Sequence, residues 1–333
     1  MITTTVGSYP KVAEGAYSTT LRGAVAKWQR KELTDAQLEA TYRDITRAVI
    51  QEHEQAGIDL LTDGQIRWED LVTPIAKRVE GFEIEGLSRW FDNNVYYRRP
   101  ILHRKPVRKQ PILVDAYRFA VRSATKPVKA VLPGPYTFAV VSEDRYFKSP
   151  RPFILAMAEV LNEEARALAE AGAPWVQFDE PALGFGKPNM KLVVEALNMA
   201  TRGVRAQTAV YTYFGSLNGA FEPLMRANVD AVGVDVVSDP QTLGRLARTR
   251  KIAKMLAIGC LDARNTKLES VEDLHRIFRA VAKSVPEDRL LVNPNCGLEF
   301  LPHTQALAKM RRLTEAVRRF KHTAHRSRRR VCC

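Results

Sequence analysis

Eight short apolar segments recur along this 333-residue chain, and a helix-forming stretch follows nearly every one of them. Clear examples are residues 128–135, 175–181, 229–237 and 255–262, each of which has Gly, Pro or an acidic residue at or near its end. Strict alternation of strands and helices is typical of parallel α/β sheets with helical crossovers. Eight such units in a chain of this length favour a single (β/α)8 TIM barrel over an open sheet. No Gly-x-Gly-x-x-Gly follows the first segment, which argues against a dinucleotide-binding fold.

The alternation is interrupted once, by residues 81–113, which follow the second apolar segment. This stretch is rich in Arg, Lys, Tyr and Pro, and we predict an excursion from the barrel that contains hairpin strands. Loops of this length within compact domains are often functional. Five cations of the excursion could either meet an anionic ligand or form a solvated surface: Arg98, Arg99, Arg104, Lys105 and Arg108.

The positive charge of the chain, +14 at pH 7, is concentrated near its end. Residues 318–330 carry seven Lys or Arg and no acidic residue. Such a segment can bind nucleic acid through counterion release, but no recognition motif accompanies it, so a solvated, disordered tail is the favoured interpretation. We therefore predict one barrel domain over residues 1–320 and a basic tail over 321–333. Nucleic acid is not favoured as a partner.

Several features of the chain predict a cytoplasmic location. No apolar run approaches the roughly 20 residues that a membrane-spanning helix needs. The first residues, Met-Ile-Thr-Thr-Thr-Val, lack the basic start and apolar centre of a signal peptide. The four cysteines show neither a Cys-x-x-Cys pair nor the spacing of a disulfide framework. We therefore expect no membrane partner.

The apolar run at 175–181, Trp-Val-Gln-Phe-Asp-Glu-Pro, ends abruptly in two adjacent carboxylates. In extended backbone Asp179 and Glu180 point to opposite faces, so one of them can face a central cavity. Alternatively, the pair caps the following helix, where Asp is common. All strands of a parallel barrel end on one face, where barrel enzymes place their chemistry. These strand ends therefore predict a polar site from Ser8, Gln65, Asp179, Glu180, Tyr213, Asp235, Arg264 and Cys296.

Five motifs spread over nearly the whole chain carry a family resemblance. They are Gly7-Ser8, Ala-Gly-Ile-Asp-Leu-Leu-Thr-Asp-Gly at 56–64, Leu-Pro-Gly-Pro-Tyr-Thr-Phe at 132–138, Gln-Phe-Asp-Glu-Pro-Ala-Leu at 177–183, and Val-Asn-Pro-Asn-Cys-Gly-Leu at 292–298. In this order the motifs resemble the catalytic C-terminal barrel of cobalamin-independent methionine synthase and its stand-alone archaeal and bacterial relatives. The resemblance implies a TIM barrel of the methionine synthase/uroporphyrinogen decarboxylase-like type.

The resemblance also implies a chemistry. In that family homocysteine is bound as a zinc thiolate and takes a methyl group from methyltetrahydrofolate, and zinc lowers the pKa of the thiol so that the thiolate exists at neutral pH. Carried onto this chain, the Gly-Ser turn would place Ser8 and the nearby backbone of Val6 at the amino-acid carboxylate. Asp179 would hold the substrate ammonium group, and Cys296 would be the last zinc ligand.

The chain departs from the family at five positions. Tyr213 and Gly215 stand where the family has a His-x-Cys pair of zinc ligands. Asp235 is the nearest match to a glutamate ligand, Gln65 replaces a glutamate that contacts the substrate ammonium group, and Arg264 replaces a histidine. Cys296 with Asp235 alone does not make a four-coordinate zinc site, so Zn²⁺ is a doubtful cofactor.

Three functions remain open at this point. The first is a methionine synthase-like methyltransferase that moves a methyl group from a methylfolate or corrinoid donor to homocysteine or a related thiol. The second is a zinc-free enzyme that acts on a small amino acid or a pterin, with Asp235, Arg264, Tyr213 and Glu180 as acid, base and anion-binding groups. The third is a non-catalytic barrel that binds a ligand or a protein partner. In the first two the partner is a small molecule.

Overall fold

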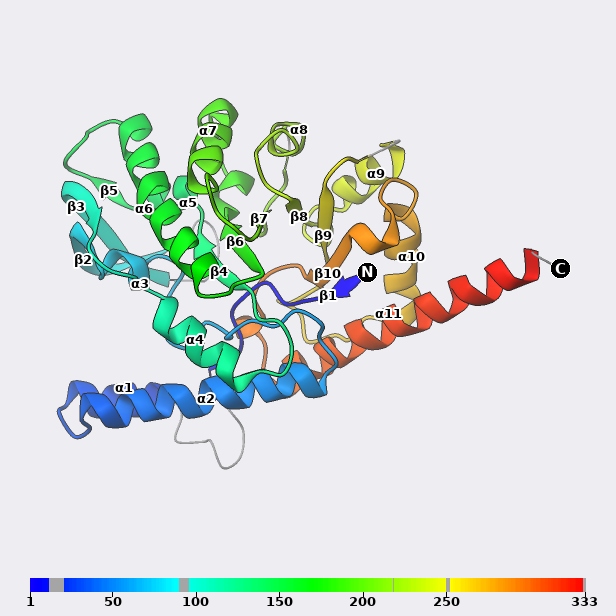
Figure 1. Ribbon diagram of the computed structural model, residues 1–333, viewed down its shortest axis with the longest axis horizontal. Coiled ribbons are helices and arrows are strands. Elements are labelled where there is room, and N and C mark those ends of the chain that lie inside the picture. Colours follow the sequence, from blue (N-terminus) through cyan, green and yellow to red (C-terminus); the bar gives the residue numbers. More distant parts are fainter. Residues whose placement is uncertain (12–20, 90–95, 218, 250–251, 332–333) are drawn as a thin grey trace. The chain divides into compact units, whose positions relative to one another are not determined.

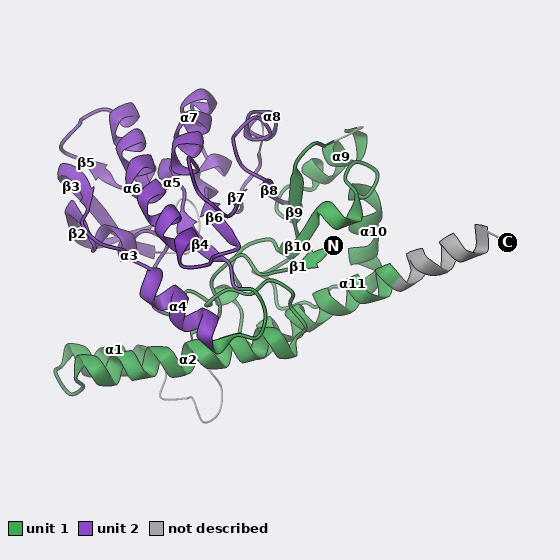
Figure 2. Cartoon of the chain, in the orientation of Figure 1, with its two compact units in different colours: residues 1–66, 123–127, 235–333 green, residues 67–122, 128–234 purple. Residues whose placement is uncertain are grey.

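The computed structural model describes residues 1–11, 21–89, 96–217, 219–249 and 252–331, with side chains as far as Lys321. The chain forms two compact units, coloured separately in Figure 2. Unit 1 comprises Met1–Ile66, Ser123–Pro127 and Asp235–Cys333, and unit 2 comprises Arg67–Arg122 and Val128–Val234. Each of the units contains parallel strands that alternate with helices along the chain (Figure 1).

Unit 1 contains both ends of the chain. Its strands are β1 (Ile2–Thr3), β9 (Met255–Leu261) and β10 (Leu290–Pro294), and its α-helices are α1 (Leu21–Gln29), α2 (Asp35–Gln55), α9 (Pro240–Arg248), α10 (Val271–Val281) and α11 (His303–Val331). Two 3-10 turns, η2 (Glu287–Arg289) and η3 (Leu298–Phe300), flank β10. β10 pairs in parallel with β1 on one side and with β9 on the other.

Local sequence signals place the helix starts of unit 1. Thr34 caps α2 through a capping box, in which its side chain accepts from the Gln37 amide and the Gln37 side chain accepts from the Thr34 amide. The Ser270 side chain accepts from the Asp273 amide at the start of α10. These caps satisfy amide groups that the first helical turn leaves without intrahelical partners.

The segment 58–64 was expected to form the second of eight strands, but it contains only isolated bridge residues, Leu60, which pairs in parallel with Thr4, and Leu61. The bridge is short because the two neighbouring amides of Asp59 and Leu60 both donate to the Thr3 carbonyl. The Asp59 carboxylate also accepts from Thr3, which fixes the segment by side-chain contacts instead of a ladder. Seven parallel strands, rather than eight, are therefore formed in the described parts of the two units.

Unit 2 contains the segment that includes Asp179. Its strands are β2 (Val79–Arg89), β3 (Tyr96–Arg108), β4 (Ala130–Pro133), β5 (Glu143–Asp144), β6 (Trp175–Asp179), β7 (Gln207–Tyr211) and β8 (Ala231–Asp235). Its helices are α3 (Thr73–Ala76), α4 (Val114–Ser123), α5 (Pro135–Val140), α6 (Pro150–Glu170), the 3-10 turn η1 (Pro181–Gly184), α7 (Met190–Ala200) and α8 (Phe221–Leu224). β4, β6, β7 and β8 pair in parallel in that order, and all residues of β4, β6 and β8 are buried.

The excursion at 81–113 contains an antiparallel pair of strands, β2 and β3, and β5 joins the edge of β3. Arg108 at the end of β3 donates to the fully buried Glu164 of α6 over 2.6 Å. Glu164 also accepts from the backbone amides of Ile112 and Leu113, which ties the end of the excursion to α6. Arg99 pairs with Glu143 and His103 lies 3.3 Å from Glu83, so several cations of the excursion already have acidic neighbours.

Helix α11 continues as far as Val331. Most side chains of the predicted basic tail, 321–333, lie outside the described part of the structure, and the division into a barrel and a tail stays a prediction. Among the helices that the structure describes, none is both long enough and apolar enough to cross a membrane.

Candidate active site

Asp179 is the last residue of β6 and is only 2% exposed. The strand register places it beside Pro133 of β4 and Tyr211 of β7, and Tyr211 in turn lies beside Gly233 of β8. Residues that lie side by side in neighbouring strands point to the same face of a sheet. Asp179 and Tyr211 therefore share a face at the carboxyl ends of their strands.

Two further polar residues belong to this site, one just before β4 and one within β6. Lys129, which precedes β4, is 3% exposed, and its ammonium group donates to Oε1 of Gln177 over 2.6 Å. An ammonium group can only donate hydrogen bonds, so the Gln177 oxygen must face Lys129 and its NH2 group must face the other way. That NH2 group donates to Asp179 Oδ1 over 2.6 Å. The lysine thus sets the orientation of the amide that contacts Asp179.

The second carboxylate oxygen of Asp179 accepts from the Tyr213 hydroxyl over 3.1 Å. We call Lys129, Gln177, Asp179, Tyr211 and Tyr213 the Asp179 cluster. Burial lowers the pKa of Lys129 to about 7, and the nearby Asp179 carboxylate opposes this shift. The cluster is therefore a buried arrangement of one acid, one base and hydrogen-bonding groups, which makes it a candidate functional site.

Glu180, although adjacent to Asp179, has different partners. Its carboxylate accepts from the backbone amides of Tyr136 and Thr137, at 2.9 and 2.6 Å, at the start of α5. Burial raises the pKa of Glu180 to about 7 despite these hydrogen bonds. Of the two roles that the sequence left open for the acidic pair, the contacts favour a helix cap for Glu180 and a site residue for Asp179. They give no support to the predicted catalytic role of Glu180.

The residues predicted at the amino-acid carboxylate lie in unit 1, around the turn at Gly7. Val6 is buried, and the Ser8 hydroxyl donates to the Glu299 carboxylate. A Cβ atom at residue 7 would stand 3.1 Å from the Gln65 side chain, so glycine allows Gln65 to pack against this turn. Gln65 is buried, and its Nε2 atom has no hydrogen-bond partner in the described part of the chain. The structure thus brings Gln65 and the Gly7 turn together.

Asp235 and Cys296, the predicted metal ligands, also lie in unit 1. Asp235 Oδ1 accepts from the amides of Val237 and Ser238, and its Oδ2 accepts from Asn295 Nδ2 over 3.2 Å. The Cys296 thiol is fully buried and donates to the Gly297 carbonyl over 3.6 Å. Burial, with smaller contributions from the Glu299 and Asp235 carboxylates, raises the pKa of Cys296 well above its usual range. Cys296 is therefore held as a neutral thiol.

These residues do not fit a zinc centre. Within the described ranges, no group of three or more His, Cys, Asp or Glu side chains is arranged to hold a metal ion. The two positions where the family has its His-x-Cys ligands carry Tyr213 and Gly215. The Tyr213 hydroxyl donates a hydrogen bond to Asp179. A structural or catalytic zinc ion needs at least three protein ligands, which this set does not supply.

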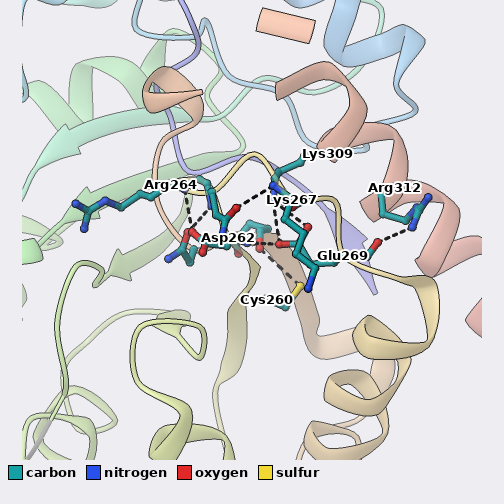
Figure 3. A network of polar contacts seen from close by, with 11 residues as sticks. Cys260, Asp262, Arg264, Lys267, Glu269, Lys309 and Arg312 are labelled. Carbon is teal, nitrogen blue, oxygen red and sulfur yellow. Dashed lines mark hydrogen bonds and ion pairs between the residues drawn. The ribbon is translucent and has the colours of Figure 1, made fainter. Parts of the chain in front are cut away.

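Arg264 is exposed and lies on the loop that follows β9. Its backbone amide donates to Asp262 Oδ1 over 2.9 Å. Figure 3 shows how this loop is held: the Lys309 ammonium group, fully buried, contacts Glu269 at 2.9 Å and the Lys267 carbonyl at 2.7 Å. Glu269 in turn accepts from the Asp262 amide. The network fixes the backbone of the loop to α11, while the Arg264 side chain points away from it.

Sequence reasoning missed Lys129 and Gln177, which are the polar residues of otherwise apolar strand segments. It placed Tyr211 at a strand end and gave it no role. A signal was present, because a lysine within a buried strand requires a polar partner. Gln177 lies two residues before Asp179 and so points to the same face of β6, but its contact with Lys129 spans 48 positions.

Comparisons with known proteins agree with these motifs. Residues 1–319 match the family described as the catalytic domain of cobalamin-independent synthase. The methionine synthase of Saccharolobus solfataricus is 30% identical to the chain, over 95% of this chain and 93% of its own length. The methionine synthase of Sulfurisphaera tokodaii is also 30% identical, over 92% of this chain and 89% of its own.

Solved structures give the same result. A B12-independent methionine synthase from Shewanella sp. W3-18-1, in complex with selenomethionine, matches with a TM-score of 0.80 and 26% identity, over 95% of this chain and 97% of its own. A methyltransferase from Methanosarcina mazei, with a TM-score of 0.63 and 14% identity over 95% of this chain and 94% of its own, shares the fold alone. The predicted α/β barrel class is thereby confirmed. The chain belongs to the cobalamin-independent methionine synthase family, a family of methyltransferases.

Proposed function

We propose that this protein is a methyltransferase that binds homocysteine or a related small amino-acid thiol, with Asp179 as the residue that holds the substrate ammonium group. The observation that carries the proposal is the Asp179 carboxylate, which is buried and oriented by Gln177 Nε2 and the Tyr213 hydroxyl. It lies within the Gln-Phe-Asp-Glu-Pro motif that the chain shares with the family. The selenomethionine complex of the Shewanella relative is consistent with an amino-acid site in this fold.

The electrostatics of Asp179 support this role. A carboxylate removed from water is stabilised by a cation that takes the place of its hydration shell. The Lys129 ammonium group and the Asp179 carboxylate both contact the Gln177 amide, and their opposite charges attract. A ligand ammonium group that reached Asp179 would form a charge-assisted hydrogen bond, which is about twice as strong as a neutral one.

No step of this proposal passes through a metal ion, because the residues present do not fit a zinc centre. The chain would supply binding and orientation of the amino acid, and methyltetrahydrofolate is the first methyl donor to test, with a methylated corrinoid as the second. Val6, Ser8 and Gln65, which lie around the Gly7 turn of unit 1, stay predicted substrate-binding residues.

A second candidate function is zinc-free acid/base chemistry on a small amino acid or a pterin. It is favoured by one observation: Tyr213, which replaces a metal ligand of the family, donates its hydroxyl hydrogen to Asp179. A phenol and a carboxylate in contact can exchange a proton, which is the arrangement that general acid–base catalysis requires.

Calorimetric titration with L-methionine tests the binding proposal. We expect Asp179→Asn to weaken binding about tenfold or more, because a hydrogen bond to a charged group contributes about 1.5–3 kcal/mol. Asp115→Asn, which changes an exposed aspartate of α4, is the matched control and should bind as the unaltered protein does. Equal affinities for the unaltered protein and Asp179→Asn would refute the role of Asp179.

Turnover separates the two candidate reactions. The protein is incubated with homocysteine and either methyltetrahydrofolate or methylcobalamin, and methionine is measured by mass spectrometry. Formation of methionine that Asp179→Asn abolishes supports methyl transfer. Tight binding of amino acids without methionine from either donor would contradict the methyltransferase proposal and favour the zinc-free alternative.

A further inference from the structure

Tyr211 closes β7 and is 2% exposed, and its hydroxyl group is buried without a hydrogen-bond partner among the residues that the structure describes. Buried tyrosine hydroxyls nearly always have a partner, because an unpaired hydroxyl loses its bonds to water without compensation. Tyr117 of α4 shows the usual case, since its buried hydroxyl donates to the Val128 carbonyl over 3.0 Å. The hydroxyl of Tyr211 therefore needs an explanation other than stability.

The surroundings of Tyr211 are built to hold its ring. A Cβ atom at residue 233 of β8 would lie 2.7 Å from the Tyr211 ring, so only glycine leaves room for it there. On another side the Lys129 ammonium nitrogen lies 4.8 Å from the ring centroid, within the range of a cation–π contact. Two elements of unit 2 thus fix the ring beside Asp179, its register partner in β6.

The chemistry of the hydroxyl is restricted to hydrogen bonding. Burial, and then the nearby Asp179 carboxylate, raise the pKa of Tyr211 above its ordinary value, so the hydroxyl is protonated at neutral pH. A protonated phenol can donate a hydrogen bond to an anion but cannot serve as a base. The group that it contacts should therefore be an acceptor, and preferably a negatively charged one.

We propose that Tyr211 is a ligand-binding residue that donates its hydroxyl hydrogen to the carboxylate of the amino acid whose ammonium group Asp179 holds. This inference rests on the proposed function. In every α-amino acid the carboxylate and the ammonium group are attached to the same carbon, so a donor beside the ammonium-binding residue meets the carboxylate of the same molecule. Tyr211 and Asp179 would together select a zwitterion over a simple amine or a simple acid.

The test compares Tyr211→Phe with Tyr117→Phe, a matched control in which the deleted hydroxyl has a protein partner. Each variant is titrated with L-methionine and with 3-(methylthio)propylamine, which lacks the carboxylate. Unfolding midpoints in urea are measured without ligand. We expect Tyr211→Phe to weaken methionine binding about tenfold, to leave binding of the amine unchanged, and to unfold at the same or a higher urea concentration. Tyr117→Phe should lower the urea midpoint and leave both affinities unchanged.

Two results would overturn the proposal. Equal weakening of both ligands would show that Tyr211 only shapes the pocket. A lower urea midpoint with unchanged methionine affinity would show that the hydroxyl is bonded within the protein or to water. Asp179→Asn, titrated in parallel, separates the two proposals: if it does not weaken methionine binding, the proposed function fails, and if it does while Tyr211→Phe does not, only the role of Tyr211 fails.

Discussion

Lys129→Met should stabilise the protein, and the gain should depend on pH. The lysine is 3% exposed, and burial lowers its pKa from 10.5 to about 7. One pKa unit corresponds to 1.36 kcal/mol, so keeping the charged lysine in the folded state costs on the order of a few kcal/mol at low pH. Methionine has a similar length and carries no charge, so it removes this cost while filling most of the same volume.

The sign of the pH dependence follows from the direction of the shift. Below pH 7 the lysine is protonated in both the folded and the unfolded states, and the full cost applies. Between pH 7 and 10.5 the unfolded state binds more protons, so the stability of the unaltered protein rises with pH. Lys129→Met lacks this rise. Its advantage should therefore shrink by on the order of a few kcal/mol between pH 6 and pH 9.

The loss of the hydrogen bond to Gln177 and of the contact with the Tyr211 ring offsets the gain by about 1 kcal/mol each. Urea unfolding of both proteins at pH 6, 7.5 and 9 measures the difference, and the exposed Lys105→Met controls for the removal of one positive charge. A difference that stays constant to within about 0.5 kcal/mol over this range would refute the reasoning, because it would show that Lys129 does not titrate there.

Two further predictions concern unit 1. Lys309→Met should destabilise the protein by about 3 kcal/mol in urea unfolding, because it leaves the Glu269 carboxylate without its buried partner. Arg319→Met, which breaks an exposed ion pair with Glu315, should cost about 0.5 kcal/mol or less. Equal effects of the two substitutions would contradict the role given to burial. Purified protein should contain well under one zinc per chain by elemental analysis, and Cys296→Ala should not change this value. A full equivalent of zinc that is lost in Cys296→Ala would show that the protein does have a zinc centre with Cys296 as a ligand.

The sequence predicted those features that depend on short-range patterns or on the family motifs. The cap residues Thr34 and Ser270 were visible because a capping residue and its partner lie three positions apart. The family motif singled out Asp179, and the structure shows it buried beside Tyr213, as a strand-end site requires. The role of Asp179 in binding stays a prediction until it is tested.

What the sequence could not supply depends on contacts between distant residues. The segment 58–64 has the composition of a strand, but backbone amides of the segment donate to Thr3 and Pro127, and only isolated bridge residues form. Lys129 belongs to the Asp179 cluster through its hydrogen bond to Gln177, a residue distant in the sequence. The unpaired hydroxyl of Tyr211 is apparent only once all its neighbours are placed. Periodicity predicts which face of a strand is buried, but not which buried polar group finds a partner.

The adjacent acids Asp179 and Glu180 show how one motif can serve both folding and function. Strand alternation directs them to opposite sides, so that Glu180 meets the backbone amides of α5 while Asp179 meets the side chains of Gln177 and Tyr213. Glu180 accepts hydrogen bonds from backbone amides, which a side-chain substitution leaves in place. These hydrogen bonds can therefore persist when the chemistry of a family member changes. Side-chain partners can be exchanged one at a time. Tyr213, at a position where the family has a metal ligand, is such an exchange, and it alters the surroundings of Asp179 without disturbing the strand that carries it.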